Sequence, residues 1–368
     1  MMLAVPFLII LAYAFLCVFF RTLTDRQSLF VCVIIAIVFS GFMMQRSLTI
    51  SDTINYIDIF NSIEWSRNAN FSLWQDFESY DIECGFAWLI ISLKFIGIKS
   101  YRLFFFLIAL FNSLGTTVGI QKFIEKDCSG DGQPLTLKKY GLLICLYISY
   151  FGFYYSGIAL RAGLSMTLIV FAINSFRDRH VCRGLIFLLI SISIHRLAVL
   201  GLVVYLTYKY FPKMTKGKFL VSWLIITVLN IFSIAFSLSS FGRNVLMMMG
   251  TRLNSYDYIR YLSQTENSVS LFVIALLLLG GAFAWLGYDD ESYRLFNVYG
   301  MGYLITAILS GIKGYSRIVD YFLIFGVALV YSLYLKKIKK PGNNKIYINV
   351  LTILYVLFNL IRSYNLYY

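Results

Sequence analysis

The chain has 368 residues, of which 59% are hydrophobic and only 14% are charged. A water-soluble domain cannot bury so much apolar side-chain surface, so this composition is typical of a protein embedded in lipid. The net charge of +14 would suit a nucleic-acid-binding protein, but the basic residues form short clusters beside apolar runs, as in the loops of membrane proteins. We therefore expect the lipid bilayer, and no nucleic acid, as a partner.

Ten apolar runs are long enough for membrane-spanning helices, which need about 20 residues each. Residues 2–20 lack a basic start and a small-residue cleavage site, and we interpret them as a retained first helix rather than a signal peptide. Two further runs are irregular, because 84–98 is short and 183–208 is long with His195 and Arg196 in its middle. The regular runs are 2–20, 28–44, 102–121, 139–156, 158–175, 219–241, 269–288, 295–312, 316–335 and 346–362.

Basic clusters between the runs predict the topology, because such clusters face the cytoplasm. All of them can do so only if 84–98 does not cross the membrane completely and if 183–208 enters and returns, with a break near His195. The alternative, in which both runs cross once, exports two clusters and is less favoured. The clusters are Arg21/Arg26, Lys122/Lys126/Lys138/Lys139, Arg177/Arg179/Arg183, Lys209/Lys213/Lys216/Lys218 and Lys336/Lys337/Lys339/Lys340.

The predicted fold is one all-α transmembrane domain over residues 1–368, with about 10–13 transmembrane helices and broken or re-entrant segments near 84–98 and 183–208. No internal repeat is visible, which weakens a transporter interpretation. The outer face is expected to comprise residues 45–100 with the acidic external loop 45–83, the turns near 152–157 and 313–317, the tip near 195 and the external loop 242–268.

Two cationic positions interrupt apolar helices near this outer face. Arg161 lies about one turn inside an apolar run and has the small neighbours Ala162 and Gly163. An arginine in the membrane is costly and usually faces a polar cavity, although it can also reach the lipid head groups. His195 and Arg196 interrupt another apolar run, and a histidine there either caps a helix break or takes part in proton transfer.

Further candidates lie at the ends of the predicted spans. Asp52 and Tyr56 share one helix face just after the second span, and Glu83 stands before the short run. Carboxylates there either bind sugar hydroxyls, act as a base or are simply solvated. Arg317, Asp320 and Tyr321 begin a late helix, while Arg243 and Arg252 lie with several tyrosines in an external loop, where arginines suit phosphate and aromatic rings suit sugars.

No cofactor or metal ion is expected. The six cysteines show no CxxC or CxxxH spacing, and no P-loop, HExxH or GxSxG motif occurs. Arginines, one histidine and a few carboxylates on one membrane face suit the recognition of a buried diphosphate, because cationic groups stabilise the charge of a departing diphosphate.

At these residues the chain resembles the EpsG-like branch of the Wzy O-antigen, capsular and exopolysaccharide polymerases. Three positions depart from the family pattern, since Ser51 replaces a glycine, Ala162 a glutamine and Arg196 a small residue. The likeness covers most of the chain in the expected order and is carried by Ser51–Tyr56, Glu83–Phe86, Leu160–Leu164, Ile194–Ala198 and the Arg317-to-Tyr321 element.

The resemblance implies a metal-independent glycosyltransferase of the GT-C-like membrane type in the bacterial inner membrane, with its active site facing the periplasm. Such polymerases join undecaprenyl-diphosphate-linked repeat units, and a chain-length regulator is a further candidate partner. His195, Asp52 and Glu83 are then the candidate catalytic residues, and which of them is the base stays open. An O-antigen ligase and a flippase of lipid-linked oligosaccharide are the alternatives.

Overall fold

The computed structural model describes residues 4–19, 24–48, 52–63, 82–127, 140–235, 271–309, 316–339 and 345–367, and in these ranges it contains helices and no β-strand. Contacts divide the chain into two compact units. Unit 1 comprises Met1–Leu202 and Leu360–Tyr368, and unit 2 comprises Val203–Asn359. Each unit is described by itself, and the assignment of a single transmembrane domain over 1–368 stays a prediction.

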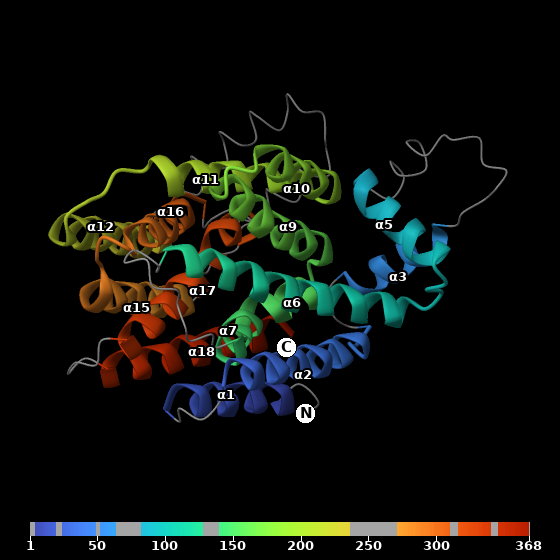
Figure 1. Cartoon of the computed structure of the whole chain (residues 1–368), viewed down its shortest axis with the longest axis horizontal. Coiled ribbons are helices and arrows are strands. Elements are labelled where there is room, and N and C mark those ends of the chain that lie inside the picture. Colours follow the sequence, from blue (N-terminus) through green and yellow to red (C-terminus); the bar gives the residue numbers. More distant parts are fainter. Residues whose placement is uncertain are drawn as a thin grey trace. The chain divides into compact units, whose positions relative to one another are not determined.

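Each of the ten predicted spans contains a helix over most of its described residues (Figure 1). In unit 1 the helices are α1 (Ala4–Phe19), α2 (Asp25–Met44), α3 (Thr53–Ser62), α5 (Cys84–Phe95), α6 (Tyr101–Asp127), α7 (Tyr140–Tyr147), α8 (Phe153–Gly157), α9 (Leu160–Arg177) and α10 (Val181–Ile194). Unit 2 contains most of α11 (Leu200–Tyr210) and of α18 (Lys345–Tyr367), together with α12 (Lys216–Ala235), α15 (Leu271–Gly287), α16 (Tyr293–Leu309) and α17 (Ser316–Lys339).

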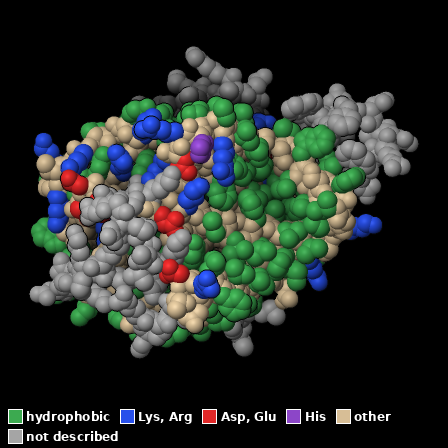
Figure 2. Space-filling view, in the orientation of Figure 1, with side chains coloured by type: hydrophobic (Ala, Val, Ile, Leu, Met, Phe, Trp, Pro, Cys, Tyr) green, Lys and Arg blue, Asp and Glu red, His purple; other side chains and the backbone are tan. Residues whose placement is uncertain are grey.

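The surface of these helices is that of a membrane protein. Large apolar side chains such as Phe95, Leu189 and Leu224 are exposed, and Figure 2 shows apolar side chains over a broad area of the surface. Water would penalise such a surface, whereas lipid does not. Within the described ranges, four helices are long and apolar enough to cross a membrane: Asp25–Met44, Tyr101–Glu125, Ser316–Lys336 and Ile346–Tyr364. Together with shorter apolar helices they make the chain an all-α polytopic membrane protein.

The run 84–98 forms a helix that is too short to span the membrane by itself, as predicted. Its helix, α5, has 12 residues and is therefore about 18 Å long, well short of the roughly 30 Å hydrocarbon layer. Lys94 lies near its C-terminal end and donates from Nζ to the carbonyl of Ile63 over 2.6 Å. The charged residue in this apolar run thus has a backbone partner that fixes the short helix to the end of α3.

The run 183–208 is broken at His195, which confirms the prediction of an interrupted segment. Helix α10 ends at Ile194, His195 has extended backbone angles (φ −154°, ψ 115°), and one 3₁₀ turn leads into α11. Ser191 Oγ donates to the Ser165 carbonyl of α9 over 2.8 Å. Six residues after the break, Gly201 lies against Ile169, which is one turn further along α9. This order of contacts indicates that the chain turns back after His195.

The turn that was expected near 152–157 lies later in the chain. After α7, a π-helical segment at Ile148–Gly152 runs directly into α8, and helical structure continues to Gly157. The turn is formed by Ile158 and Ala159, because both of their N–H groups donate to the Tyr154 carbonyl. Gly152 does not end the helix. The helical residues after it, Phe153, Tyr154 and Tyr155, bury their aromatic rings in the core of unit 1.

Two basic segments of unit 1, at the ends of α6 and α9, meet at one end of the unit. Lys122 Nζ lies 3.5 Å from the Asp178 carboxylate, and Arg177 Nη1 donates to the Phe123 carbonyl over 2.8 Å. These contacts join the C-terminal ends of α6 and α9. Because α9 begins at Leu160, Arg161 lies at the opposite end of the unit. The charge rule places the basic end in the cytoplasm.

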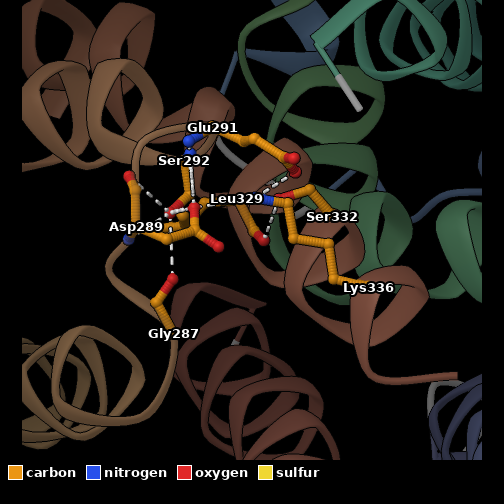
Figure 3. A network of polar contacts seen from close by, with 7 residues as sticks. All are labelled: Gly287, Asp289, Glu291, Ser292, Leu329, Ser332 and Lys336. Atoms are coloured by element: carbon orange, nitrogen blue, oxygen red, sulfur yellow. Dashed lines mark hydrogen bonds and ion pairs between the residues drawn. The ribbon is translucent and has the colours of Figure 1, made fainter. Parts of the chain in front are cut away.

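In unit 2 the short turn between α15 and α16 binds two basic segments. Asp289 Oδ1 accepts hydrogen bonds from the backbone N–H and the hydroxyl of Ser292 over 2.8 and 2.7 Å, and Lys336 Nζ lies 2.8 Å from the same oxygen and 3.1 Å from Glu291 (Figure 3). Lys213 pairs with Asp290 over 2.6 Å. The basic segments that contain Lys213 and Lys336 therefore lie at the same end of unit 2, as the topology requires.

We predict that a cysteine at position 196 is labelled from outside the cell, whereas cysteines at 179 and 213 are not. The substitutions Arg196→Cys, Arg179→Cys and Lys213→Cys are made singly in a protein without native cysteines, and an impermeant thiol reagent is added to intact cells or spheroplasts. Permeabilised cells serve as the control and should show all three positions labelled. External labelling of Lys213→Cys in an active protein would contradict the returning segment.

Candidate functional site

The carboxylate of Glu83 joins three segments that lie far apart in the sequence. Its Oε2 atom accepts a hydrogen bond from Arg161 Nη1 over 2.5 Å. Its Oε1 atom lies 3.2 Å from His195 Nδ1 and accepts the backbone N–H of Arg196 over 3.2 Å. The side chains of Glu83 and His195 are each 12% exposed and that of Arg161 is 24% exposed. The result is a largely buried charged cluster at the end of unit 1 opposite its basic clusters.

A close helix contact brings Glu83 to the break after α10. Gly85 lies in the first turn of α5, and a Cβ atom there would come within 2.7 Å of the Ser193 backbone carbonyl group. Only glycine permits the two backbones to approach so closely. Glu83, two residues before Gly85, therefore reaches His195 and the backbone N–H of Arg196.

Arg161 is held by tight packing in the first turn of α9. A Cβ atom at Gly163 would lie 2.7 Å from the Tyr155 carbonyl oxygen and from Asn112 Nδ2, so α9 packs closely against α8 and α6. The Arg161 side chain interacts with the hydroxyl of Tyr56 as well as with Glu83. Tyr56 is buried and packs edge-on against Phe86, with 5.9 Å between the ring centroids.

The Glu83 carboxylate is ionised throughout the physiological range. Glu83 precedes α5 and lies outside the spanning helices. Burial by itself raises its pKa, but the hydrogen bond from His195 and the positive charge of Arg161 outweigh burial and lower the pKa to about 2. Because the folded-state pKa is below the ordinary value, this ion pair stabilises the fold above that value and is lost only as the pH falls towards 2.

The state of Glu83 also determines which nitrogen of neutral His195 carries the proton. An ionised carboxylate can only accept hydrogen bonds, so Nδ1 must donate to Glu83 and Nε2 then presents a lone pair. Nε2 is buried and has no hydrogen-bond partner among the residues that the structure describes. A buried polar atom of this kind can accept a proton or a hydrogen bond from a ligand.

The other predicted site residues near this cluster have different surroundings. Asp52 has a left-handed backbone (φ 64°) immediately before α3, a conformation that aspartate tolerates better than most residues. Its carbonyl accepts the N–H of Tyr56 over 3.0 Å, so Asp52 lies one turn from the tyrosine that contacts Arg161. Arg196 joins the cluster through its backbone N–H.

Five further predicted site residues belong to unit 2, whereas the Glu83 cluster belongs to unit 1. Arg317, Asp320 and Tyr321 belong to the first two turns of α17 in unit 2, where Asp320 and Tyr321 are fully buried. Arg243 and Arg252, with the external loop 242–268, lie outside the described residues, as does 64–81 of the loop 45–83. Their roles in substrate binding stay predictions.

Arg46 was not among the site residues predicted from the sequence. Arg46 Nη1 donates to the carbonyls of Ser156 and Gly157 over 3.1 and 2.8 Å, directly before the turn that leads to Arg161. An arginine that follows an apolar helix on the outer face is uncommon under the charge rule, and this was the available signal.

No group of three or more histidine, cysteine, aspartate or glutamate side chains could hold a metal ion in the parts of the chain that the structure describes. Function without a metal ion therefore stays a prediction, to be tested by chelation.

We predict that Gly85→Ala destabilises the protein, because the new methyl group would overlap the Ser193 backbone and push α5 away from α10. Overpacking of this kind costs about 1–3 kcal/mol and should lower the thermal unfolding midpoint of the purified protein in detergent. Gly41→Ala is the matched control, since a Cβ atom at Gly41 has nothing within 4 Å. Equal midpoints for the two variants would refute the close contact.

Comparison with known proteins identifies the family of the chain. Neither the search of curated proteins nor that of solved structures gives a significant match, so the GT-C likeness stays a prediction. The model of the EpsG family matches residues 28–368, nearly the whole chain, and this range includes Glu83, Arg161 and His195. The resemblance drawn from the sequence is thereby confirmed: the chain belongs to the EpsG family.

Proposed function

We propose that this protein is a polysaccharide polymerase that joins undecaprenyl-diphosphate-linked repeat units at the periplasmic face of the bacterial inner membrane. Membership of the EpsG family suggests a function of this type. The observation that carries the proposal is the Glu83 carboxylate, which holds a guanidinium from Arg161 and an imidazole from His195 in one largely buried cluster. These two groups suit glycosyl transfer from a diphosphate, because a guanidinium can stabilise the leaving diphosphate and an imidazole can accept the acceptor proton.

The reaction breaks one C–O bond and forms another. The hydroxyl oxygen of the acceptor sugar attacks the anomeric carbon of the growing chain, the bond from that carbon to the diphosphate oxygen breaks, and its electron pair leaves with the diphosphate. The acceptor proton passes to a base. Arg161 stabilises the charge that develops on the leaving diphosphate, because a guanidinium donates two parallel hydrogen bonds to phosphate oxygens.

Among the three candidate bases, the geometry favours His195. Glu83 is engaged by two donors and a cation, and with a pKa of about 2 it has little tendency to take a proton at neutral pH. Asp52 lies one turn before Tyr56, the residue that contacts Arg161. His195 instead offers Nε2, which is buried and lacks a partner in the described ranges, and Glu83 stabilises the positive charge that protonation would create.

The proposed orientation follows from charge. The cluster lies at the end of unit 1 opposite Lys122 and Arg177, and basic ends of membrane proteins face the cytoplasm. The site would then face the periplasm, where a lipid-linked sugar diphosphate lies at the membrane surface within reach of Arg161. A chain-length regulator stays a candidate partner.

We predict that Arg161→Ala abolishes long polymer without removing the protein from the membrane. Loss of a preorganised donor to a developing anion lowers turnover by about 100- to 1,000-fold, and Arg161→Lys should restore only part of it because an ammonium lacks the planar fork. Polymer length is measured on gels in a deletion strain that carries each variant, with membrane abundance measured by immunoblot. Arg102→Ala is the matched control, since Arg102 is an exposed arginine at the start of α6.

The same deletion strain separates the candidate functions. Single repeat units without long chains would support a polymerase. Lipid-linked polymer that is not attached to its final acceptor would indicate a ligase, and lipid-linked units held on the cytoplasmic side would indicate a flippase. Normal chain length in well-expressed Arg161→Ala cells would contradict the assigned role of this arginine.

We also predict that the purified protein extends lipid-linked repeat units in the presence of EDTA. The positive charge that a metal ion would otherwise supply to the diphosphate comes from arginine. Product is measured with lipid-linked units from the deletion strain, with and without chelator. Activity that disappears in EDTA and returns with one divalent ion would overturn the metal-independent mechanism.

A further inference from the structure

Arg46 follows the C-terminal end of α2 and binds a part of unit 1 that is 110 residues away in sequence. One guanidinium nitrogen, Nη1, donates to two successive carbonyls, those of Ser156 and Gly157, over 3.1 and 2.8 Å. These are the last two residues of α8. Arg46 is thus a side-chain cap on the end of a helix to which it is not adjacent in sequence.

The two carbonyls need a partner because the chain turns immediately after them. In a continuous α-helix they would accept the N–H groups of Leu160 and Arg161, four residues on. The turn at Ile158 and Ala159 removes both of those donors, since α9 begins its own hydrogen bonding with the N–H of Gly163 donating to the carbonyl of Ala159. Arg46 supplies the missing donor.

Aromatic rings fix the guanidinium in this position. Its carbon lies 3.6 Å from the ring centroid of Phe105 on α6 and 6.0 Å from that of Tyr56 on α3. The first distance is short for a cation over an aromatic ring, an arrangement that is favourable when the cation is desolvated. Tyr56 in turn interacts with Arg161, so Arg46 contacts both the turn before Arg161 and the tyrosine beside it.

We infer that Arg46 is a positioning residue for Arg161: it closes the α8–α9 turn and supports Tyr56, so that the Arg161 guanidinium faces Glu83. It acts through these neighbours and not through the substrate. The inference rests on the proposed function for its effect on polymer, but the closure of the turn is a property of the fold and can be measured without any substrate.

The first measurement tests the turn alone. Ile158→Cys is introduced into a protein without native cysteines, where the side chain at position 158 is only 7% exposed. Its labelling by a thiol reagent should be slow and should become at least about tenfold faster with Arg46→Gln, because labelling of a buried thiol follows local opening. Arg46→Lys should give an intermediate rate, since an ammonium can donate to the carbonyls but cannot stack on Phe105. Arg102→Gln is the control and should change nothing.

The second measurement is polymer length in cells that carry the same Arg46 and Arg102 variants with native residue 158. Arg46→Gln should shorten the polymer, Arg46→Lys should restore part of it, and Arg102→Gln should match the wild type. Membrane abundance and thermal midpoint are recorded for each variant, so that simple loss of protein is recognised.

Faster labelling together with shorter polymer at wild-type abundance would support the inference. Unchanged labelling in Arg46→Gln would overturn the inference, whatever polymer length this variant gives. Faster labelling with normal polymer would also overturn it, provided that Arg161→Ala abolishes polymer. Normal polymer in Arg161→Ala would refute the proposed function instead, and labelling alone would then decide whether Arg46 closes the turn.

Discussion

The charge of Glu83 in a largely buried position is the constraint on which the site depends. A carboxylate with 12% of its side chain exposed is costly unless donors and cations compensate for the lost water. Arg161 provides a cation, His195 a ring N–H and Arg196 a backbone N–H. Each of these groups comes from the end of a helix, so satisfying one carboxylate fixes the start of α5, the start of α9 and the break after α10 in one place.

Helix ends within or beside a membrane need partners of their own, because lipid offers no hydrogen bonds. In the described part of unit 1, three such helix ends have side-chain partners. Lys94 binds the carbonyl of Ile63, Arg46 binds the last carbonyls of α8, and Glu83 binds the N–H of Arg196. Charged side chains therefore serve as caps as well as candidate ligands, and they lie at the end of the unit opposite its basic clusters.

This arrangement suits an enzyme that acts at one membrane surface. The cluster combines a guanidinium, which suits a diphosphate, with an imidazole whose Nε2 has no partner among the described residues. Glu83 serves both by holding the cation and by selecting the tautomer of the ring. Both candidate carboxylates precede helices: Glu83 is ion-paired with Arg161 before α5, and Asp52 lies one turn before Tyr56 at the start of α3.

The sequence by itself determined the helices, the interruption at His195 and the residues of the cluster. Hydropathy over about 20 residues and the positions of basic clusters are local signals, and they located helices in all ten predicted runs and the short helix in 84–98. What only the tertiary structure decided is which groups meet. Glu83 pairs with Arg161 and His195 across 78 and 112 residues, and Arg46 caps α8 across 110. It also decided that the turn before Arg161 is formed by Ile158 and Ala159, just after the expected position near 152–157. Such pairings depend on how closely the backbones approach at Gly85 and Gly163 and on which helix ends need hydrogen-bond partners. Both are properties of long-range packing, which a short sequence pattern does not predict.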